Sequence, residues 1–206
     1  MKKSFLTLAC AMAFVISTAS AATKKSKAPS YTGVIKANPL GLAVGYFNAE
    51  YEMPLGVVNG LALNGTYYSY GNSVISLTGI GAGGMYRFYS KGKGKQLNSF
   101  YYGPLLNVAS FTWKYDYYDY DTNFNLVTAQ AKSSLFAIAP GFGLGRQWIF
   151  NGGFTIDLGG GVQYYIVSAV QFKDANGNAL TGVTTLGGFH GIWPTLWFSL
   201  GYAFGK

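Results

Sequence analysis

Two acidic residues, Glu50 and Glu52, stand in Tyr46–Met53, a segment that alternates apolar side chains with polar ones. An alternation with a period of two places both carboxylates on one face of a strand. If the sheet closes on itself, that face is the interior, where charges must be paired or hydrated. We expect these carboxylates to pair with Lys36 or Arg87. The predicted interior polar network consists of Lys36, Asn48, Glu50, Glu52, Arg87, Asp157 and Gln163, with Gln147 as a further candidate.

The interior network has two interpretations. In the first, the charges satisfy one another and fill the lumen, because an eight-stranded barrel is just wide enough for side chains to fill it. In the second, they form a gate or a narrow polar path for small solutes or ions.

A second acidic group, Asp116, Asp119 and Asp121, lies in a tyrosine-rich segment. The residues from Asp119 onward match the start of a calcium-binding loop. The sixth position is Phe124 instead of glycine, and the twelfth is Gln130 instead of glutamate, so an EF-hand is excluded. Two interpretations remain: a weak divalent-cation site in an external loop, or a solvated loop whose tyrosines sit above a bilayer.

Two other motifs predict no chemistry. Gly79–Gly84 matches G-x-G-x-x-G, but a dinucleotide site needs a helix after it, and Met85–Tyr89 has the pattern of a strand. We expect its glycines to line the interior and to make room for large side chains opposite. His190 is the single histidine and is expected to be a loop residue, since one histidine does not build a metal site. We therefore predict neither a metal nor a cofactor.

Long strands must position the interior residues. Phe154–Ile166 and Ile192–Phe204 alternate apolar side chains with small or polar ones over more than ten residues. Such strands suit a closed antiparallel barrel with lipid outside. The predicted strands are Thr32–Leu42, Tyr46–Leu55, Leu61–Tyr70, Ser73–Tyr89, Ser99–Tyr115, Ser133–Phe150, Phe154–Lys173 and Ile192–Phe204.

Three details of this topology are predicted from the pattern. Thr32–Leu42 must be a separate first strand, although Asn38 and Pro39 interrupt it, because seven strands would leave the sheet open in lipid. A bulge near Gly79 is expected to reconcile the two halves of the fourth strand. The connections after the fifth and seventh strands are predicted to be long and external.

The first residues predict export. Lys2 and Lys3 precede the short apolar run Phe5–Ile16, and a small-residue cleavage site ends at Ala21. This is the pattern of a secretory signal peptide, too short to span a bilayer as a helix. Cys10, the only cysteine, belongs to that peptide, so no disulfide is expected afterwards. We assign 1–21 to the signal peptide, 22–31 to a basic flexible leader and 32–206 to the barrel domain.

Composition agrees with a membrane location. Of 206 residues, 50% are hydrophobic and 17% aromatic, whereas only 11% are charged. A soluble domain carries about 25% charged residues. No apolar stretch long enough for a helical span follows the signal peptide, so barrel strands are favoured. The net charge of +8 is spread along an exported chain, which argues against nucleic acid as a partner.

The C-terminal residues Gly201, Tyr202 and Phe204 resemble the aromatic-ended strand that the barrel-assembly machinery recognises, although two residues follow Phe204. With the signal peptide and the alternating strands, the chain resembles the small eight-stranded outer-membrane barrels of the OmpA and OmpX kind. Ile35–Leu40, together with Glu50–Glu52, is similar to an uncharacterised barrel family. The resemblance implies a Gram-negative outer membrane, and lipid and lipopolysaccharide as surroundings.

Three functions are compatible with these sequence features. The first is a non-enzymatic outer-membrane barrel with a structural or surface-interaction role, whose surface ligand is not indicated. The second is a narrow porin-like channel. The third is a lipid-modifying enzyme, which lacks the expected serine because Gly191 and Ile192 follow His190.

Overall fold

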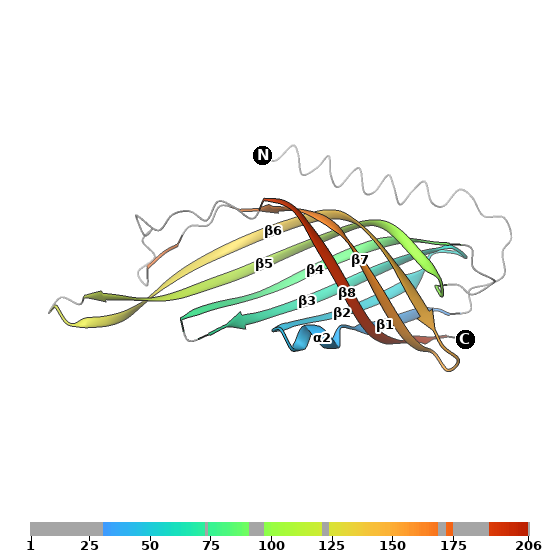
Figure 1. Cartoon of the computed structure of the whole chain (residues 1–206), viewed down its shortest axis with the longest axis horizontal. Helices are drawn as coiled ribbons and strands as arrows, with labels where there is room; N and C mark the ends of the chain where they lie inside the picture. Colours follow the sequence, from blue (N-terminus) through green and yellow to red (C-terminus); the bar gives the residue numbers. More distant parts are fainter. Residues whose placement is uncertain are drawn as a thin grey trace.

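Eight antiparallel strands form a closed ring in the computed structural model (Figure 1). The structure describes residues 31–72, 74–90, 97–120, 124–168, 172–174 and 190–205. Each strand pairs with the next and the last pairs with the first, so the predicted all-β, up-and-down topology is confirmed. The elements are β1 (Gly33–Ala37), α2 (Pro39–Leu42), β2 (Tyr46–Pro54), β3 (Asn59–Gly71), β4 (Ile75–Tyr89), β5 (Phe100–Tyr120), β6 (Leu126–Ile149), β7 (Phe154–Val167) and β8 (Gly191–Phe204).

Within the described part of the chain, no helix has the length and apolar character needed to cross a membrane. The predicted signal peptide and all of the basic leader except Tyr31 lie outside the described residues.

The first strand is shorter than predicted. It is a separate strand, but it ends at Ala37, and the short helix α2 follows. Asn38 caps that helix, because its side-chain oxygen accepts a hydrogen bond from the backbone N–H of Gly41 at 3.0 Å. Pro39 then suits the first helical position, where its missing N–H costs nothing. The Asn-Pro pair that interrupts the strand pattern is therefore a helix start.

The bulge predicted near Gly79 is wrong. Gly79 stands opposite Tyr68 on one side and Phe111 on the other, in the same registers as the rest of β4. The polar residue Ser76 therefore lies on the outer face, where it pairs with Lys114. Because Lys114 also lies on the outer face at this position, the Ser76 hydroxyl is compatible with an outward orientation. No bulge is needed to turn it inward.

The hairpin of β5 and β6 extends past the other strands (Figure 1). The long connection predicted after the fifth strand is therefore wrong, since most of that segment is paired. Asp116 stands opposite Gln130, whose side-chain nitrogen donates to the Asp116 carboxylate at 2.8 Å. The other long connection, 168–190, follows β7, which ends earlier than the predicted Lys173.

Inward and outward faces follow the predicted parity. Ile35, Leu158 and Leu196 point outward and are 57%, 52% and 85% exposed. Inward glycines leave room for large side chains, as predicted. A Cβ atom added at Gly159 would lie 2.4 Å from the ring of Trp197, and one at Gly145 would lie 2.5 Å from the Tyr101 hydroxyl.

Candidate functional site: an ion cluster and a polar belt inside the ring

An ion cluster lies inside the ring and brings together the five charged residues predicted from the sequence. Lys36 on β1 is its centre, with only 1% of its surface exposed. Its ammonium nitrogen lies 2.7 Å from Glu50, 2.9 Å from Glu52 and 2.6 Å from Asp157. The ammonium also donates to the side-chain oxygen of Gln147 at 2.5 Å. The Lys36 ammonium on β1 therefore contacts side chains from β2, β6 and β7.

Arg87 on β4 is the second cation and contacts the same three carboxylates. One guanidinium nitrogen lies 2.8 Å from Glu52 and 2.9 Å from Asp157. The other lies 3.0 Å from Glu50. The guanidinium also stacks over the ring of Tyr101, 4.3 Å from its centroid. A planar guanidinium suits this position because it serves several oxygens at fixed angles.

Two tyrosines complete the cluster, and the sequence analysis did not identify either. Tyr89 donates to Glu52 and Tyr101 donates to Asp157, each at 2.5 Å. Together with the cations, they give every carboxylate oxygen of these two acids a donor, as buried charges require. Tyr89 is two residues from Arg87 and so shares its interior parity, a signal that could have identified it.

Apolar side chains pack against the cluster. They include buried residues from the first residues of the described chain, from before β5 and from the ends of β6 and β8. The side-chain amide nitrogen of Gln147 donates to the Leu97 backbone oxygen at 3.0 Å, which links the ions to this apolar layer. The buried residues of this apolar layer include Tyr31, Val34, Leu97, Ile149 and Ala203.

The three carboxylates carry one more charge than the two cations. Their oxygens lie within 4.8 Å of one another, a spacing that could hold a metal ion. Lys36 and Arg87 already contact all three acids, so the cationic positions among the carboxylates are taken by the protein's own side chains. The five charged side chains therefore form one ionic network.

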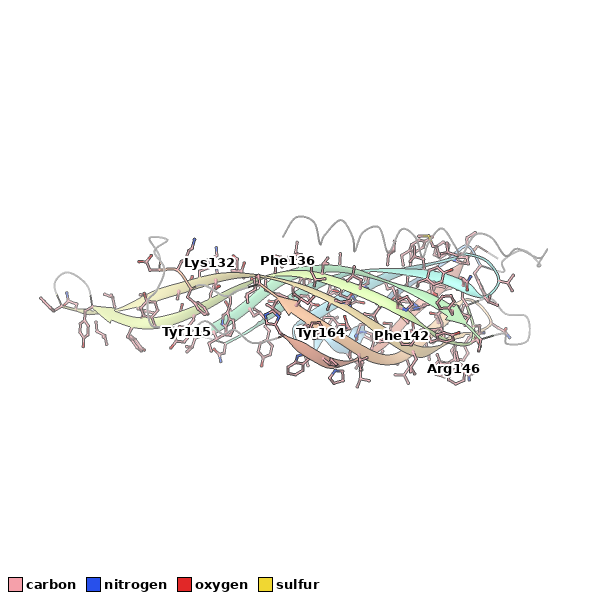
Figure 2. All side chains as sticks on the ribbon, turned by 90° about the horizontal axis from the view of Figure 1, so that it is seen from above. Tyr115, Lys132, Phe136, Phe142, Arg146 and Tyr164 are labelled. Atoms are coloured by element: carbon pink, nitrogen blue, oxygen red, sulfur yellow. The ribbon has the colours of Figure 1, made fainter. Side chains whose placement is uncertain are left out.

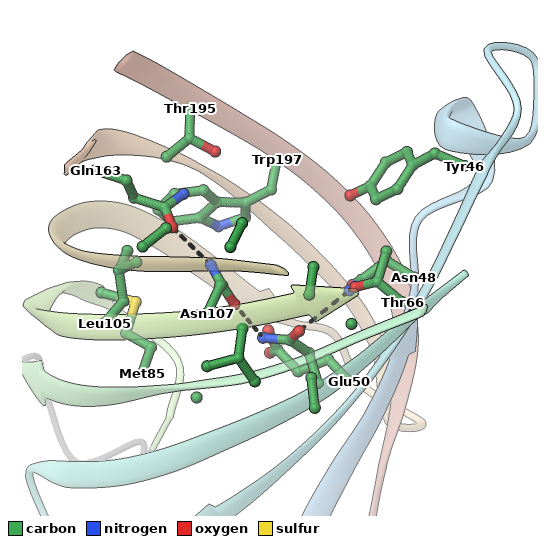
Figure 3. Close-up of a pocket in the computed structure, with 18 of the residues that line it drawn as sticks. Tyr46, Asn48, Glu50, Thr66, Met85, Leu105, Asn107, Gln163, Thr195 and Trp197 are labelled. Carbon is green, nitrogen blue, oxygen red and sulfur yellow. Dashed lines mark hydrogen bonds between the residues drawn. The ribbon is translucent and has the colours of Figure 1, made fainter. Parts of the chain in front are cut away.

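The other two predicted network residues, Asn48 and Gln163, belong to a separate polar belt. Asn48 donates to the Thr66 hydroxyl at 2.8 Å, and Asn107 donates to Gln163 at 2.8 Å (Figure 3). Asn64 lies between these pairs, 3.5 Å from Asn107. The belt borders a cavity of about 380 Å³ that reaches Glu50 and Arg87 of the ion cluster. The belt is uncharged and built from amides and hydroxyls.

The predicted assembly residues lie in β8 where it pairs with β1. Gly201 stands opposite Lys36, and a Cβ atom there would lie 2.6 Å from the Lys36 side chain. Tyr202 points outward and is 57% exposed, and Phe204 pairs with Gly33. Gly201 therefore has a packing role that the sequence motif does not indicate.

The remaining predicted residues are not brought into a site. His190 is exposed next to the start of β8. Of the predicted cation-binding aspartates, Asp116 is bonded to Gln130 within the hairpin. The side chain of Asp119 and the whole of Asp121 lie outside the described residues.

The outer face of β6 carries an apolar stretch between two basic residues. Arg146 and Lys132 lie toward opposite ends, with Phe136 and Phe142 between them (Figure 2). Arg146 stacks over the rings of Phe100 and Trp148 at 4.6 and 5.1 Å. The outward positions from one basic residue to the other are Leu144, Phe142, Pro140, Ile138, Phe136 and Ser134.

At the other boundary of this stretch, two lysines face each other. Lys132 pairs across the ladder with Lys114, and both side chains share the outer face. The backbone of Lys132 also bridges to Lys173. Like charges opposite one another on a sheet are destabilising, and Asp116, two residues from Lys114 on the same face of β5, is the acidic residue nearest to this pair in the ladder.

No family model matches the chain, and a search of curated proteins found no match either.

Proposed function

We propose that this protein is a non-enzymatic outer-membrane barrel whose lumen is closed by its ion cluster. It acts as a structural or surface-interaction element of the membrane. Residues 1–21 would direct its export, and the barrel-assembly machinery would insert it through the strand that ends at Phe204. The observation that carries the proposal is the combination of an apolar outer face with charges that are buried and paired inside.

The apolar stretch on β6 has the dimensions of a membrane band. At about 3.4 Å per residue and a tilt of about 40°, the span from Leu144 to Phe136 is about 20 Å high, close to the ~25 Å apolar band of outer-membrane barrels. Arg146 and Lys132 then lie at the two headgroup levels. The facing pair Lys114 and Lys132 suits the anionic headgroups of lipopolysaccharide, whose charge would offset their repulsion.

The ion cluster supports a closed lumen. Lys36, Glu52, Arg87 and Asp157 are each at most 1% exposed, and side chains from six strands, β1, β2, β4, β5, β6 and β7, meet there. A water-filled path would leave such side chains hydrated. This burial favours the structural interpretation of the network over the gate.

Membrane insertion predicts a mobility shift on gels. A closed ring in which every strand is hydrogen-bonded to both neighbours should resist detergent until it is boiled, so unboiled protein should migrate differently from boiled protein. The measurement is electrophoresis of detergent-extracted membranes with and without heating. Recovery of the protein in the detergent-free soluble fraction, with the same mobility in both lanes, would contradict the proposal.

The closed lumen predicts an electrically silent protein. In planar lipid bilayers, the refolded protein should give no discrete conductance steps at either polarity. A general porin recorded in the same bilayers serves as the positive control for insertion. Reproducible steps that scale with salt concentration would favour the porin-like alternative.

A further inference from the structure

A second cavity adjoins the polar belt on the side of the extended hairpin. It measures about 560 Å³ and is lined mainly by aromatic and aliphatic side chains, among them Tyr70, Trp113, Leu135 and Trp193. It shares lining residues with the smaller cavity, so the two lie side by side. The shared residues are Phe111, Ala137 and Tyr165.

Taken together, the two adjoining cavities have the chemistry of a ligand site. Small-molecule sites measure about 300–1,000 Å³ and combine apolar walls with a few convergent polar groups. Here the apolar walls form one end and the amides of Asn64, Asn107 and Gln163 form the other. The nearest charges, Glu50 and Arg87, are already paired with each other. The site therefore matches a molecule with an apolar body and an uncharged hydrogen-bonding head.

Strand pairing does not close the side of the ring along its whole length, and the short helix α2 lies beside β2 and β8 there. β1 pairs with β8 only from Leu200 to Phe204, so no described β1 residue pairs with Gly191–Ser199. The smaller cavity is lined from both sides of this interval, by Tyr46 of β2 and by Thr195 and Trp197 of β8 (Figure 3). It also reaches Leu196, whose side chain is 85% exposed on the outer wall.

We propose that the interior binds one neutral amphiphile, which enters between β2 and β8. Its apolar body occupies the larger cavity and its head bonds to the amide belt. The site goes beyond the proposed function and does not depend on it, because the closed ring alone forms the cavities. Binding can therefore be tested without a membrane.

The test uses the full-length protein refolded into a detergent-free amphipathic polymer. Native mass spectrometry and calorimetry would follow the binding of 1-monodecanoylglycerol, whose head is neutral and rich in hydroxyls. Sodium decanoate and decyltrimethylammonium carry the same chain length with charged heads. We expect one decanoylglycerol per chain and at least about tenfold weaker binding of both charged compounds, since the belt has no free charge to pair with them. Absence of decanoylglycerol binding, or equal binding of all three, would overturn the proposal.

Two neighbouring positions on β6 give a matched pair of variants. Ala137 lines both cavities, so Ala137→Phe should fill their junction and abolish binding. Ile138→Phe adds a ring on the outer face and should leave binding unchanged. Far-ultraviolet circular dichroism checks that each variant keeps the β structure of the parent protein, and Ala109→Phe from β5 replaces Ala137→Phe if the latter does not fold. Undiminished binding to a folded, filled variant would overturn the proposal, whereas failure of membrane insertion alone would leave it standing.

Discussion

Replacing Arg87 by alanine should lower the free energy of unfolding by about 3–5 kcal/mol, the usual cost of breaking a buried ion pair by removing one partner. The guanidinium contacts Glu50, Glu52 and Asp157, and without it three carboxylates share Lys36 as their only cation. The measurement is urea unfolding of the refolded protein in detergent micelles, followed by tryptophan fluorescence.

Neutralising one of the acidic residues that contact Arg87 should restore part of the stability lost in Arg87→Ala, and the amount should depend on which acid is changed. In the Arg87→Ala background, Glu52→Gln should recover more stability than Glu50→Gln. The Glu52 side chain is fully buried, whereas that of Glu50 is 13% exposed and can be hydrated. This order follows from the cost of leaving a charge unpaired away from water. Equal rescue by both changes would mean that water reaches the whole cluster.

Arg146 provides the control for Arg87. It lies on the outer face over Phe100 and Trp148, so Arg146→Ala should cost only about 0.5–1 kcal/mol, the value of an exposed cation–π contact. If the two arginine variants lose the same stability, the ion cluster is not the stabilising centre that its burial indicates.

The five clustered charges could be predicted because a period of two is visible in sequence. Glu50 and Glu52 share a face with each other, and Asp157 is the charged member of the small-residue face of β7. In a ring this narrow, inward charges have few neighbours other than one another. Strand parity and charge balance therefore suffice to propose the pairing of Lys36 and Arg87 with the acids.

The height of each residue along the ring could not be predicted, because it depends on the register between strands. Asn48 and Gln163 have the right parity but lie at the level of the polar belt, away from Lys36. Tyr89 and Tyr101 were missed because a tyrosine on a barrel strand can as well belong to an interfacial girdle. Only the register shows that their hydroxyls meet Glu52 and Asp157.

Replacing an outer-face residue by arginine should lower the free energy of unfolding substantially only where that residue lies near the middle of the bilayer. Val162 of β7 is 52% exposed and pairs with Phe142 of β6, inside the apolar stretch. At about 3.4 Å per residue and a tilt of about 40°, it lies about 10 Å inside the level of Arg146, near the middle of a ~25 Å band. Val162→Arg should therefore lower the free energy of unfolding by about 2–4 kcal/mol when the protein is refolded into lipid vesicles.

Leu158 is the matched control, because it lies on the same face of the same strand and is also 52% exposed. It pairs with Arg146, so it sits at the level where a basic side chain already reaches the headgroups. Leu158→Arg should cost only about 0–1 kcal/mol, the value near an interface. In vesicles the difference between the two variants measures depth in the bilayer. If both variants cost the same, the basic residues do not mark the membrane boundaries, and the outer face has no apolar band of the proposed height.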